Sequence, residues 1–405
     1  MKVINIVLFC SLTALGADTF STDKIDPAAA GMDPGRLASI PSRLKEFVDA
    51  NKVAGIVTLL ARHGYIANIS AVGYRELEDK VPMKTDTIFR IMSMTKPITC
   101  AGVMMLVDEG KISLLDPVEK YIPEFKDLKL NPCGTRVGYS CQTVAATRAV
   151  NVLDLMTHTS GLGDGFRGGR GGNTAPPSTL AEVISSVEHA TLLFDPGTAW
   201  NYSNFGIATL GRLIEVVSKE PYERFMAERI FQPLGMKDTS FFLPADKQNR
   251  LAALYTYESS GLQRVMRNPF TYPSPDSGLL STAADLARFS EMMLRKGTLN
   301  GTRILSAAAV EAMTRSWTGD LKAGYAPGVG QGFGYEVVRE PLGTYRYTSV
   351  GSFEKAGAFR TYYWVDPAKD LAGVILMQRT NGGAASDVAD EINCFMAMAA
   401  AAIER

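Results

Sequence analysis

Residues 88–110 read "IFRIMSMTKPITCAGVMMLVDEG" and place Ser93 three positions before Lys96, at the expected start of a helix. Pro97 falls in the first turn of this helix, where a missing backbone N–H is tolerated, and Gly110 follows its end. One helical turn separates the two side chains, so the lysine amine can lie beside the serine hydroxyl. The segment therefore predicts a serine nucleophile with a lysine as its base.

The spacing by itself does not establish a nucleophile, because it recurs three times elsewhere in the chain. The other copies are Ser21/Lys24, Ser42/Lys45 and Ser352/Lys355. The first follows a presumed cleavage site, the second lies mid-helix on a solvated pattern, and the third lies at the approach to a strand. A lysine acts as a base only when burial lowers its pKa, and a helix start adds N–H groups for an oxyanion. Only the pair at residues 93 and 96 has that context.

A second element is Tyr202-Ser203-Asn204, the only Tyr-x-Asn sequence in the chain. It follows a turn at Asp195–Gly197 and precedes an expected helix. A phenol and an amide two positions apart in an extended link can both point into a cleft, where the phenol can relay a proton. The pattern alone leaves open the alternative of an ordinary tyrosine at a helix approach.

A third element begins at Lys355 in "FEKAGAFRTYYWVDP", which is expected to start a strand. A strand that lines the cleft can offer the Ala358 N–H as an oxyanion donor beside that of Ser93, and Gly357 allows close backbone approach. A similar tripeptide, Lys322–Gly324, lies in a loop rich in Gly and Pro with no strand behind it. The later tripeptide is therefore preferred.

Taken in order, the three elements resemble the serine β-lactamase and penicillin-binding-protein superfamily, whose members carry Ser-x-x-Lys and Lys-Thr-Gly motifs. The resemblance is closest to class C β-lactamases and to their esterase relatives, the family VIII carboxylesterases, which use Tyr-x-Asn as the middle motif. It extends over most of the chain from about Asp33, through segments such as "VLDLMTHTSGL", "PGTAWNYSNFG" and "GLLSTAADLARFSEMML".

The resemblance implies a role for each site residue. Ser93 attacks an acyl carbonyl, while Lys96 and Tyr202 shuttle the proton. The backbone N–H groups of Ser93 and Ala358 hold the oxyanion, and Tyr202 helps to activate the water that releases the acyl group. Asn204 orients an amide or ester group of the substrate. No cofactor and no metal ion is implied, and no histidine is required.

The sequence departs from the family pattern at Ala356, where β-lactamases and penicillin-binding proteins have a hydroxyl that helps to bind the β-lactam carboxylate. Lys355 is nevertheless retained, although the esterase relatives often replace it. Lys355 is expected either to attract a carboxylate or to hold the environment of Tyr202 electrostatically. Together with Asn204 and Gly357 it forms the expected substrate-binding set.

Three functions remain open from the sequence. The first, which is preferred, is a serine carboxylesterase on small acyl esters. The second is a β-lactamase or D-Ala-D-Ala carboxypeptidase, which requires carboxylate recognition at Lys355. The third is a covalent β-lactam sensor, which is acylated but does not release the acyl group. The retention of Tyr202 alongside Lys96 argues against this function. An α/β-hydrolase is not expected, because the chain has no Gly-x-Ser-x-Gly elbow.

The composition excludes several other classes. The 405 residues are 46% hydrophobic and 21% charged, which is typical of a globular protein with a large core. The 42 Lys and Arg balance the 42 Asp and Glu, so a nucleic-acid partner is not expected. The three His form no cluster with Cys at metal-ligand spacing, so no metal site is expected. The expected partner is a small-molecule ester or amide.

The N-terminal residues 1–17 are expected to be a secretory signal peptide, with one Lys followed by an apolar run too short to span a membrane. An N-terminal buried strand is the alternative. No other segment is apolar enough to span a bilayer. In a eukaryote the sequon at Asn201 would put a glycan in the proposed active site, so we expect bacterial export to the periplasm or the extracellular space. In such a compartment Cys133 and Cys141 are candidates for a disulfide, whereas Cys100 and Cys394 are expected to be buried thiols.

The order of the expected elements predicts an α/β (α+β) fold. A helix and a strand hairpin with its turn at His63-Gly64 come first, helices and loops follow, and strands with a closing helix come last. This order predicts an antiparallel sheet built from both termini with flanking helices and an inserted, mostly helical domain. The expected divisions are 1–17, 18–92, 93–240 and 241–405.

Two further features are expected at the rim of the cleft. The first is an apolar acyl pocket formed by aromatic side chains, with core packing as the alternative: Phe166, Trp200, Tyr272, Phe353 and Phe359. The second is a Gly-rich loop over residues 161–172, carrying Arg167 and Arg170, which either covers the cleft or is a solvated connector.

Overall fold

The computed structural model describes residues 20–133, 141–163, 177–324, 326–340, 347–380 and 390–404. The expected signal peptide lies outside the described residues, as do Phe166, Arg167 and Arg170. Within the described part of the chain, no helix is both long and apolar enough to cross a bilayer.

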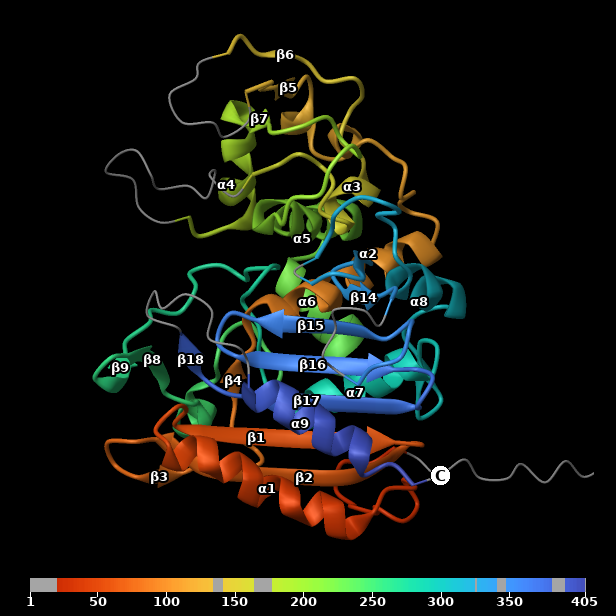
Figure 1. The fold of residues 1–405 in the computed structure, drawn as a ribbon. Coiled ribbons are helices and arrows are strands. Elements are labelled where there is room, and N and C mark those ends of the chain that lie inside the picture. The colour runs from red at the N-terminus through yellow and green to blue at the C-terminus, as the bar shows by residue number, and fades with distance from the viewer. Residues whose placement is uncertain are drawn as a thin grey trace, which may run out of the picture.

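A large antiparallel sheet organises the structure, with strand order β13-β14-β15-β16-β17-β1-β2-β3 (Figure 1). Its strands are β1 (Gly55–Arg62), β2 (Tyr65–Glu76), β3 (Val81–Pro82), β13 (Val329–Gln331), β14 (Glu336–Val338), β15 (Phe353–Gly357), β16 (Thr361–Asp366) and β17 (Leu371–Leu376). Strand β1 pairs with β17, so the two ends of the chain meet inside one sheet. The predicted sheet built from both termini is confirmed.

The remaining strands form small two- and three-stranded sheets. They are β4 (Phe89–Arg90), β5 (Lys129–Leu130), β6 (Val144–Ala145), β7 (Thr191–Leu192), β8 (Leu254–Glu258), β9 (Gly261–Val265), β10 (Leu280–Ser281), β11 (Thr298–Leu299), β12 (Thr302–Arg303) and β18 (Arg379–Thr380). The pairing of β4 with β10 matters for the site, because it leads directly into the segment that contains Ser93.

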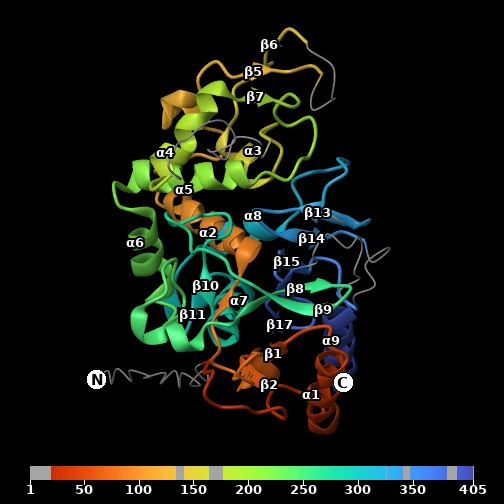
Figure 2. The ribbon, with the colours of Figure 1, turned by 90° about the vertical axis from the view of Figure 1, so that its left-hand side faces the viewer.

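Helices cover both faces of the large sheet and extend beyond the end of the sheet formed by β13 and β14 (Figures 1 and 2). The α-helices are α1 (Pro34–Asp49), α2 (Thr95–Asp108), α3 (Val152–Met156), α4 (Leu180–Ser185), α5 (Asn204–Ser218), α6 (Tyr222–Met226), α7 (Ala283–Leu294), α8 (Ala307–Thr314) and α9 (Asp390–Ala401). Short 3-10 or π turns are η1 (Met92–Met94), η2 (Val118–Lys120), η3 (Pro123–Phe125), η5 (Ser186–His189), η6 (Ala227–Phe231) and η7 (Ala245–Arg250).

The two faces of the sheet enclose separate apolar cores. Helices α1 and α9 pack on one face, where Leu37 and Leu44 of α1 and Phe395 of α9 meet Trp364 of the sheet. Helix α7 packs on the opposite face, where the core continues into helices α2 to α6 (Figure 2). Because β1 and β17 are covered on both faces, they read as continuous apolar runs rather than as alternating ones.

Local sequence explains the N-terminal elements. The side chain of Asp33 caps α1 by accepting hydrogen bonds from the N–H groups of Gly35 and Arg36, and Pro34 opens the helix. Positive φ angles of 55° at His63 and 81° at Gly64 allow the tight turn between β1 and β2. Both the predicted helix and the predicted hairpin turn are confirmed.

One prediction about the C-terminal strands is wrong. The segment from Lys355 to Ala358 was expected to start a strand, but Lys355 lies inside β15, which ends at Gly357, and Ala358 lies in the turn that leads to β16. This turn is closed by Arg360 at φ 59° rather than by Gly or Asn, so the sequence carries no turn signal there. The turn between β16 and β17 lies at residues 367–370.

The cysteines largely follow the predictions. Cys133 and Cys141, which were only candidates for a disulfide from the sequence, form one in the structure. Cys100 is buried in α2, and burial raises the pKa of its thiol to about 12. Cys394 on α9 is only half-buried, because it lies on the side of the helix turned away from the sheet core.

The contact between Gly373 and Trp364 provides a test of the packing. The two residues are paired across β16 and β17, and a Cβ at position 373 would overlap the Trp364 indole. We expect Gly373→Ala to lower the free energy of unfolding by about 1–3 kcal/mol, as measured by chemical denaturation. Gly206→Ala is the control, because its Cβ would meet nothing closer than Ser203 Oγ at 3.5 Å in a helix interior. An unchanged stability of Gly373→Ala would contradict this account.

Candidate active site

Ser93 lies in the short 3-10 turn η1, directly before α2 and three residues after Arg90 of β4. Met92, the residue before it, has φ 51°, which for a non-glycine residue costs about 1–2 kcal/mol. The Thr95 hydroxyl stabilises this turn by donating to the Met92 carbonyl at 2.7 Å. The strained turn presents the half-buried Ser93 side chain at the mouth of the buried helix.

Lys96 is fully buried, and its Nζ contacts three acceptors from separate parts of the chain. Nζ donates to Ser93 Oγ at 3.1 Å, to Asn204 Oδ1 at 2.8 Å and to the backbone carbonyl of Asp276 at 2.8 Å. The Asp276 carboxylate itself accepts hydrogen bonds from the hydroxyls of Ser274 and Ser277, which hold this segment in place. Lys96 is thereby held beside the serine hydroxyl.

Tyr202 approaches Ser93 from the segment before α5. Its hydroxyl donates to Ser93 Oγ at 2.9 Å, so the serine oxygen contacts both the phenol and the Lys96 amine. The amine of Lys96 lies 4.7 Å and that of Lys355 lies 5.0 Å from the centre of the Tyr202 ring. Two cations therefore flank the phenol, which favours negative charge on its oxygen while a proton is in transfer.

His158 supports Tyr202 from behind. Its ring lies 4.7 Å from the Tyr202 ring, and its Nδ1 accepts a hydrogen bond from the Ser203 N–H at 3.2 Å. Ser203 in turn caps α5 by accepting from the Gly206 N–H at 3.0 Å, which places Asn204 in the first turn. Burial, with smaller contributions from Lys355 and Lys96, lowers the pKa of His158 well below its usual value, so this imidazole is neutral.

Lys355 and Glu336 lie together on neighbouring strands. Both side chains are buried, and Lys355 Nζ lies 3.9 Å from Glu336 Oε1. Burial lowers the pKa of Lys355, while the nearby charge of Glu336 acts in the opposite direction. Glu336 was missed from the sequence, although a lone carboxylate in the apolar run "GFGYEVV" was a visible signal.

A cavity of about 370 Å³ connects these groups. It is lined by Met92, Ser93, Tyr202, Asn204, Asp276, Ser277, Glu336, Lys355, Ala356, Gly357 and Ala358. The structure thus brings the predicted catalytic, oxyanion and substrate-binding residues to one place, with Lys96 behind the cavity and bonded to Ser93. Besides Glu336, the sequence analysis missed Asp276 and Ser277, whose segment "SPDSGLL" looked like an ordinary turn.

The expected aromatic acyl pocket is wrong for the residues that can be placed. Phe353 and Phe359 are buried in apolar clusters, and the half-buried Trp200 donates to Gln331 Oε1 at 3.2 Å. Tyr272 packs at the edge of the main core. None of the four lines the cavity at Ser93, because core packing is the commoner use of a large aromatic side chain.

The described residues contain no group of three or more His, Cys, Asp or Glu side chains that could hold a metal ion. The groups around Ser93 are hydroxyl, amine, amide, carboxylate and backbone groups. A serine oxygen beside a buried amine and a phenol is suited to attack on an acyl carbonyl, with proton transfer to either neighbour.

Comparison with known proteins identifies the family. Residues 40–393 match the protein-family model described as Beta-lactamase. The chain belongs to the beta-lactamase family. This family places it in the superfamily of serine hydrolases that includes esterases, β-lactamases and penicillin-binding proteins.

Individual relatives agree with the assignment of this protein to the beta-lactamase family. It is 35% identical to Protein Rv1367c of Mycobacterium tuberculosis over 356 residues, which cover 83% of this chain and 88% of the relative. It is 27% identical to Esterase EstB of Burkholderia gladioli over 386 residues, covering 87% and 93%. The solved structure of EstCE1 shares the fold, with TM-score 0.76 and 23% identity over 91% of this chain and 99% of that one.

The buried His158 provides a test by pH. The pKa of His158 is lowered in the folded state, so as the pH falls this imidazole takes up a proton in the unfolded chain before it does so in the folded one. Protonation therefore favours the unfolded chain below the ordinary histidine pKa. We expect the free energy of unfolding to fall below pH 6.5, relative to that of His158→Gln, by up to about 1.4 kcal/mol per pH unit. Denaturant titrations of both proteins between pH 7.5 and 5 measure this difference, and parallel curves would contradict it.

Proposed function

We propose that this beta-lactamase-family protein is a serine carboxylesterase that hydrolyses small acyl esters through an acyl-enzyme at Ser93. The observation that carries the proposal is the double contact of Ser93 Oγ, with Lys96 Nζ at 3.1 Å and the Tyr202 hydroxyl at 2.9 Å. A serine hydroxyl is a weak nucleophile until a neighbouring base takes its proton, and two groups here can do so.

The first half-reaction forms the acyl-enzyme. Ser93 Oγ attacks the acyl carbon as its proton passes to the Lys96 and Tyr202 pair, and the carbonyl oxygen becomes an oxyanion. The backbone N–H groups of Ser93 and Ala358 are the proposed donors to that oxyanion. The intermediate then expels the alcohol, which takes up the same proton, and Asn204 orients the substrate beside Lys96.

The second half-reaction releases the acid. A water molecule gives a proton to the Tyr202 oxygen and attacks the acyl carbon, and the oxyanion forms again at the same donors. Collapse breaks the bond to Ser93 Oγ, which recovers its proton. Neither half-reaction calls for a carboxylate on the substrate, so neutral esters meet all the chemical requirements of the site.

The pairing of Lys355 with Glu336 favours esters over β-lactams. In the superfamily the lysine and a neighbouring hydroxyl attract the β-lactam carboxylate, but here the hydroxyl is replaced by Ala356 and a carboxylate lies 3.9 Å from the amine. An incoming carboxylate would approach two opposite charges instead of one cation. The names of EstB, an esterase, and of EstCE1, a hydrolase with promiscuous acyltransferase activity, support the same choice.

A β-lactamase or D-Ala-D-Ala carboxypeptidase is the second candidate, because the buried Lys355 still lines the cavity at Ser93. A non-turnover β-lactam sensor is less favoured, because the contact between Tyr202 and Ser93 supplies a route for deacylation. We also propose that the protein is exported, which the disulfide between Cys133 and Cys141 supports, since such bonds persist in oxidising compartments.

Hydrolysis of p-nitrophenyl acetate and butyrate, compared with nitrocefin, tests the proposed nucleophile. We expect Ser93→Ala to lower kcat for both esters by at least about a thousandfold, because the variant lacks the oxygen that is proposed to attack the acyl carbon. Ser42→Ala is the matched control, since Ser42 precedes Lys45 at the same spacing but is exposed on α1. Ester turnover that survives in Ser93→Ala would overturn the assignment, and wild-type turnover of nitrocefin faster than of the esters would favour the second candidate.

Removal of the Glu336 charge tests the basis for substrate choice. We expect Glu336→Gln to raise kcat/KM for nitrocefin relative to p-nitrophenyl butyrate by roughly tenfold, because the charge of Lys355 is then unopposed. Glu340→Gln is the control, since Glu340 is exposed just beyond β14 and does not line the cavity at Ser93. An unchanged ratio would mean that Glu336 does not determine the preference.

A further inference from the structure

A second cavity, of about 320 Å³, adjoins the one at Ser93. The two cavities share Met92 and Ser277 in their walls. Arg90, which lines the second cavity, lies three residues before Ser93 on the same segment. A substrate held at Ser93 can therefore extend into this second cavity, which none of the residues with proposed catalytic roles lines.

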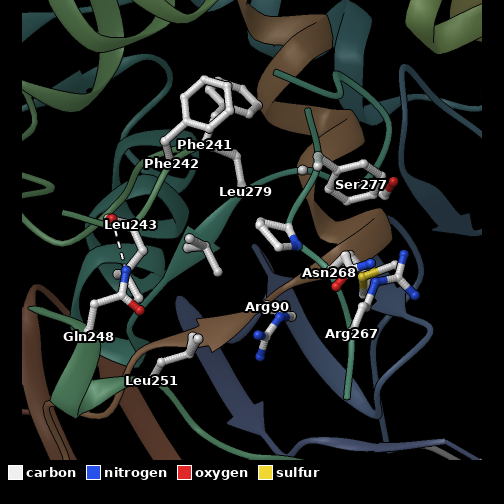
Figure 3. A pocket seen from close by; sticks show the side chains of 15 residues that line it. Arg90, Phe241, Phe242, Leu243, Gln248, Leu251, Arg267, Asn268, Ser277 and Leu279 are labelled. Carbon is white, nitrogen blue, oxygen red and sulfur yellow. Dashed lines mark hydrogen bonds between the residues drawn. The ribbon is translucent and has the colours of Figure 1, made fainter. Parts of the chain in front are cut away.

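The second cavity has an apolar side. Figure 3 shows Phe241, Phe242 and Leu279 gathered along one side of it, with Leu243 and Leu251 further along. Phe241 and Leu279 are buried, whereas Phe242 is 47% exposed. An apolar chain that entered the cavity would cover this exposed ring and be removed from water.

The other side carries two guanidinium groups, Arg90 and Arg267 (Figure 3). Arg90 is half-buried on β4, and its Nη1 donates to the Ala252 carbonyl at 3.2 Å. Within the described residues no carboxylate pairs with Arg90. Arg267 lies exposed at the rim, where its guanidinium stacks 5.1 Å from the centre of the Phe359 ring and 5.5 Å from that of Phe270.

The two cations affect each other. Burial, together with the charge of Arg267, lowers the pKa of Arg90. Two like charges at one cavity disfavour each other unless an anion offsets them, and guanidinium groups bind carboxylates through paired N–H donors. In the cavity at Ser93, Lys355 has the Glu336 carboxylate 3.9 Å away, whereas Arg90 has no carboxylate partner within the described residues. Arg90, with Arg267 lining the same cavity, is thus the better place for an anionic group of the substrate.

We propose that the second cavity binds an apolar chain that ends in a carboxylate, so that the preferred substrates are esters bearing such an anionic tail. This inference rests on the proposed esterase function and names its substrate class. The tail can belong to the acyl part or to the alcohol part of the ester, since in both cases the ester carbonyl can still lie at Ser93. A neutral chain of the same length would fill the apolar side but leave Arg90 without an opposite charge.

Two matched series of esters test the proposal. In the first, mono-p-nitrophenyl adipate and suberate are compared with p-nitrophenyl hexanoate and octanoate, so that the acyl chains differ only in the terminal carboxylate. In the second, 6-acetoxyhexanoate is compared with hexyl acetate, which places the tail on the alcohol. In at least one series we expect kcat/KM to be about tenfold higher for the anionic member, mainly through a lower KM.

Arg267→Gln is the main variant, because this side chain is exposed and its replacement should not disturb the core. We expect Arg267→Gln to bring the ratio of kcat/KM for the anionic ester to kcat/KM for the neutral ester close to one, while turnover of the neutral esters is kept. Arg90→Gln is expected to act in the same direction. Arg264→Gln is the matched control, since Arg264 lies three residues earlier, pairs with Glu76 and does not line the cavity. Equal or lower kcat/KM for the anionic members of both series, or a preference unchanged in Arg267→Gln, would overturn the inference.

A binding measurement separates this inference from the proposed esterase function. Calorimetry of Ser93→Ala with monomethyl adipate and with methyl hexanoate needs no turnover. Tighter binding of monomethyl adipate, lost in the Ser93→Ala/Arg267→Gln double variant, supports the anionic subsite even if wild-type ester hydrolysis proves independent of Ser93. Equal binding of the two compounds counts against the subsite even if hydrolysis depends on Ser93 as proposed.

Discussion

The hydrogen bonds of Lys96 are the constraint on which the rest of the site depends. One buried amine joins the turn at Ser93, the first residue of α5 at Asn204 and the main chain at Asp276, which lie far apart in the sequence. A buried amine is tolerated only where it has such partners, so the three segments must meet for the helix to be buried at all. The same bonds that compensate the burial of Lys96 also align the nucleophile with its base.

In the architecture around this amine, the part of the fold that supports the site is distinct from the part that carries the proposed reacting groups. The sheet, held by the pairing of β1 with β17 and covered by helices on both faces, forms the rigid part. The proposed reacting groups lie where β15 meets the start of α2 and the segment before α5, and each is held by a neighbour. His158 holds the Tyr202 segment and Thr95 holds the strained turn at Met92, so the side chains lie close to their working positions before substrate arrives.

Charge distribution around the cavity is the basis for the proposed preference for esters over β-lactams. The cation that the family uses for carboxylates, Lys355, has Glu336 beside it, whereas Arg90 and Arg267 line the adjoining cavity. In the proposals made above, the site keeps the acyl-transfer groups of the family, and the position for an anionic group of the substrate shifts to the adjoining cavity. Small changes of charge at fixed geometry are a general way in which one fold serves different substrates.

The sequence by itself determined the family and the antiparallel sheet from both termini, and it pointed to Ser93, Lys96 and Tyr202, which the structure brings together, because these depend on local spacing and on motif order. It misjudged the end of β15, since the left-handed Arg360 gives no turn signal. It also missed Glu336, Asp276 and the pair Arg90 and Arg267, and it placed Phe353 and Phe359 in a pocket when they lie in the core. Only the tertiary structure decided these points, because electrostatic and cavity contacts join residues that are far apart along the chain and carry no fixed spacing.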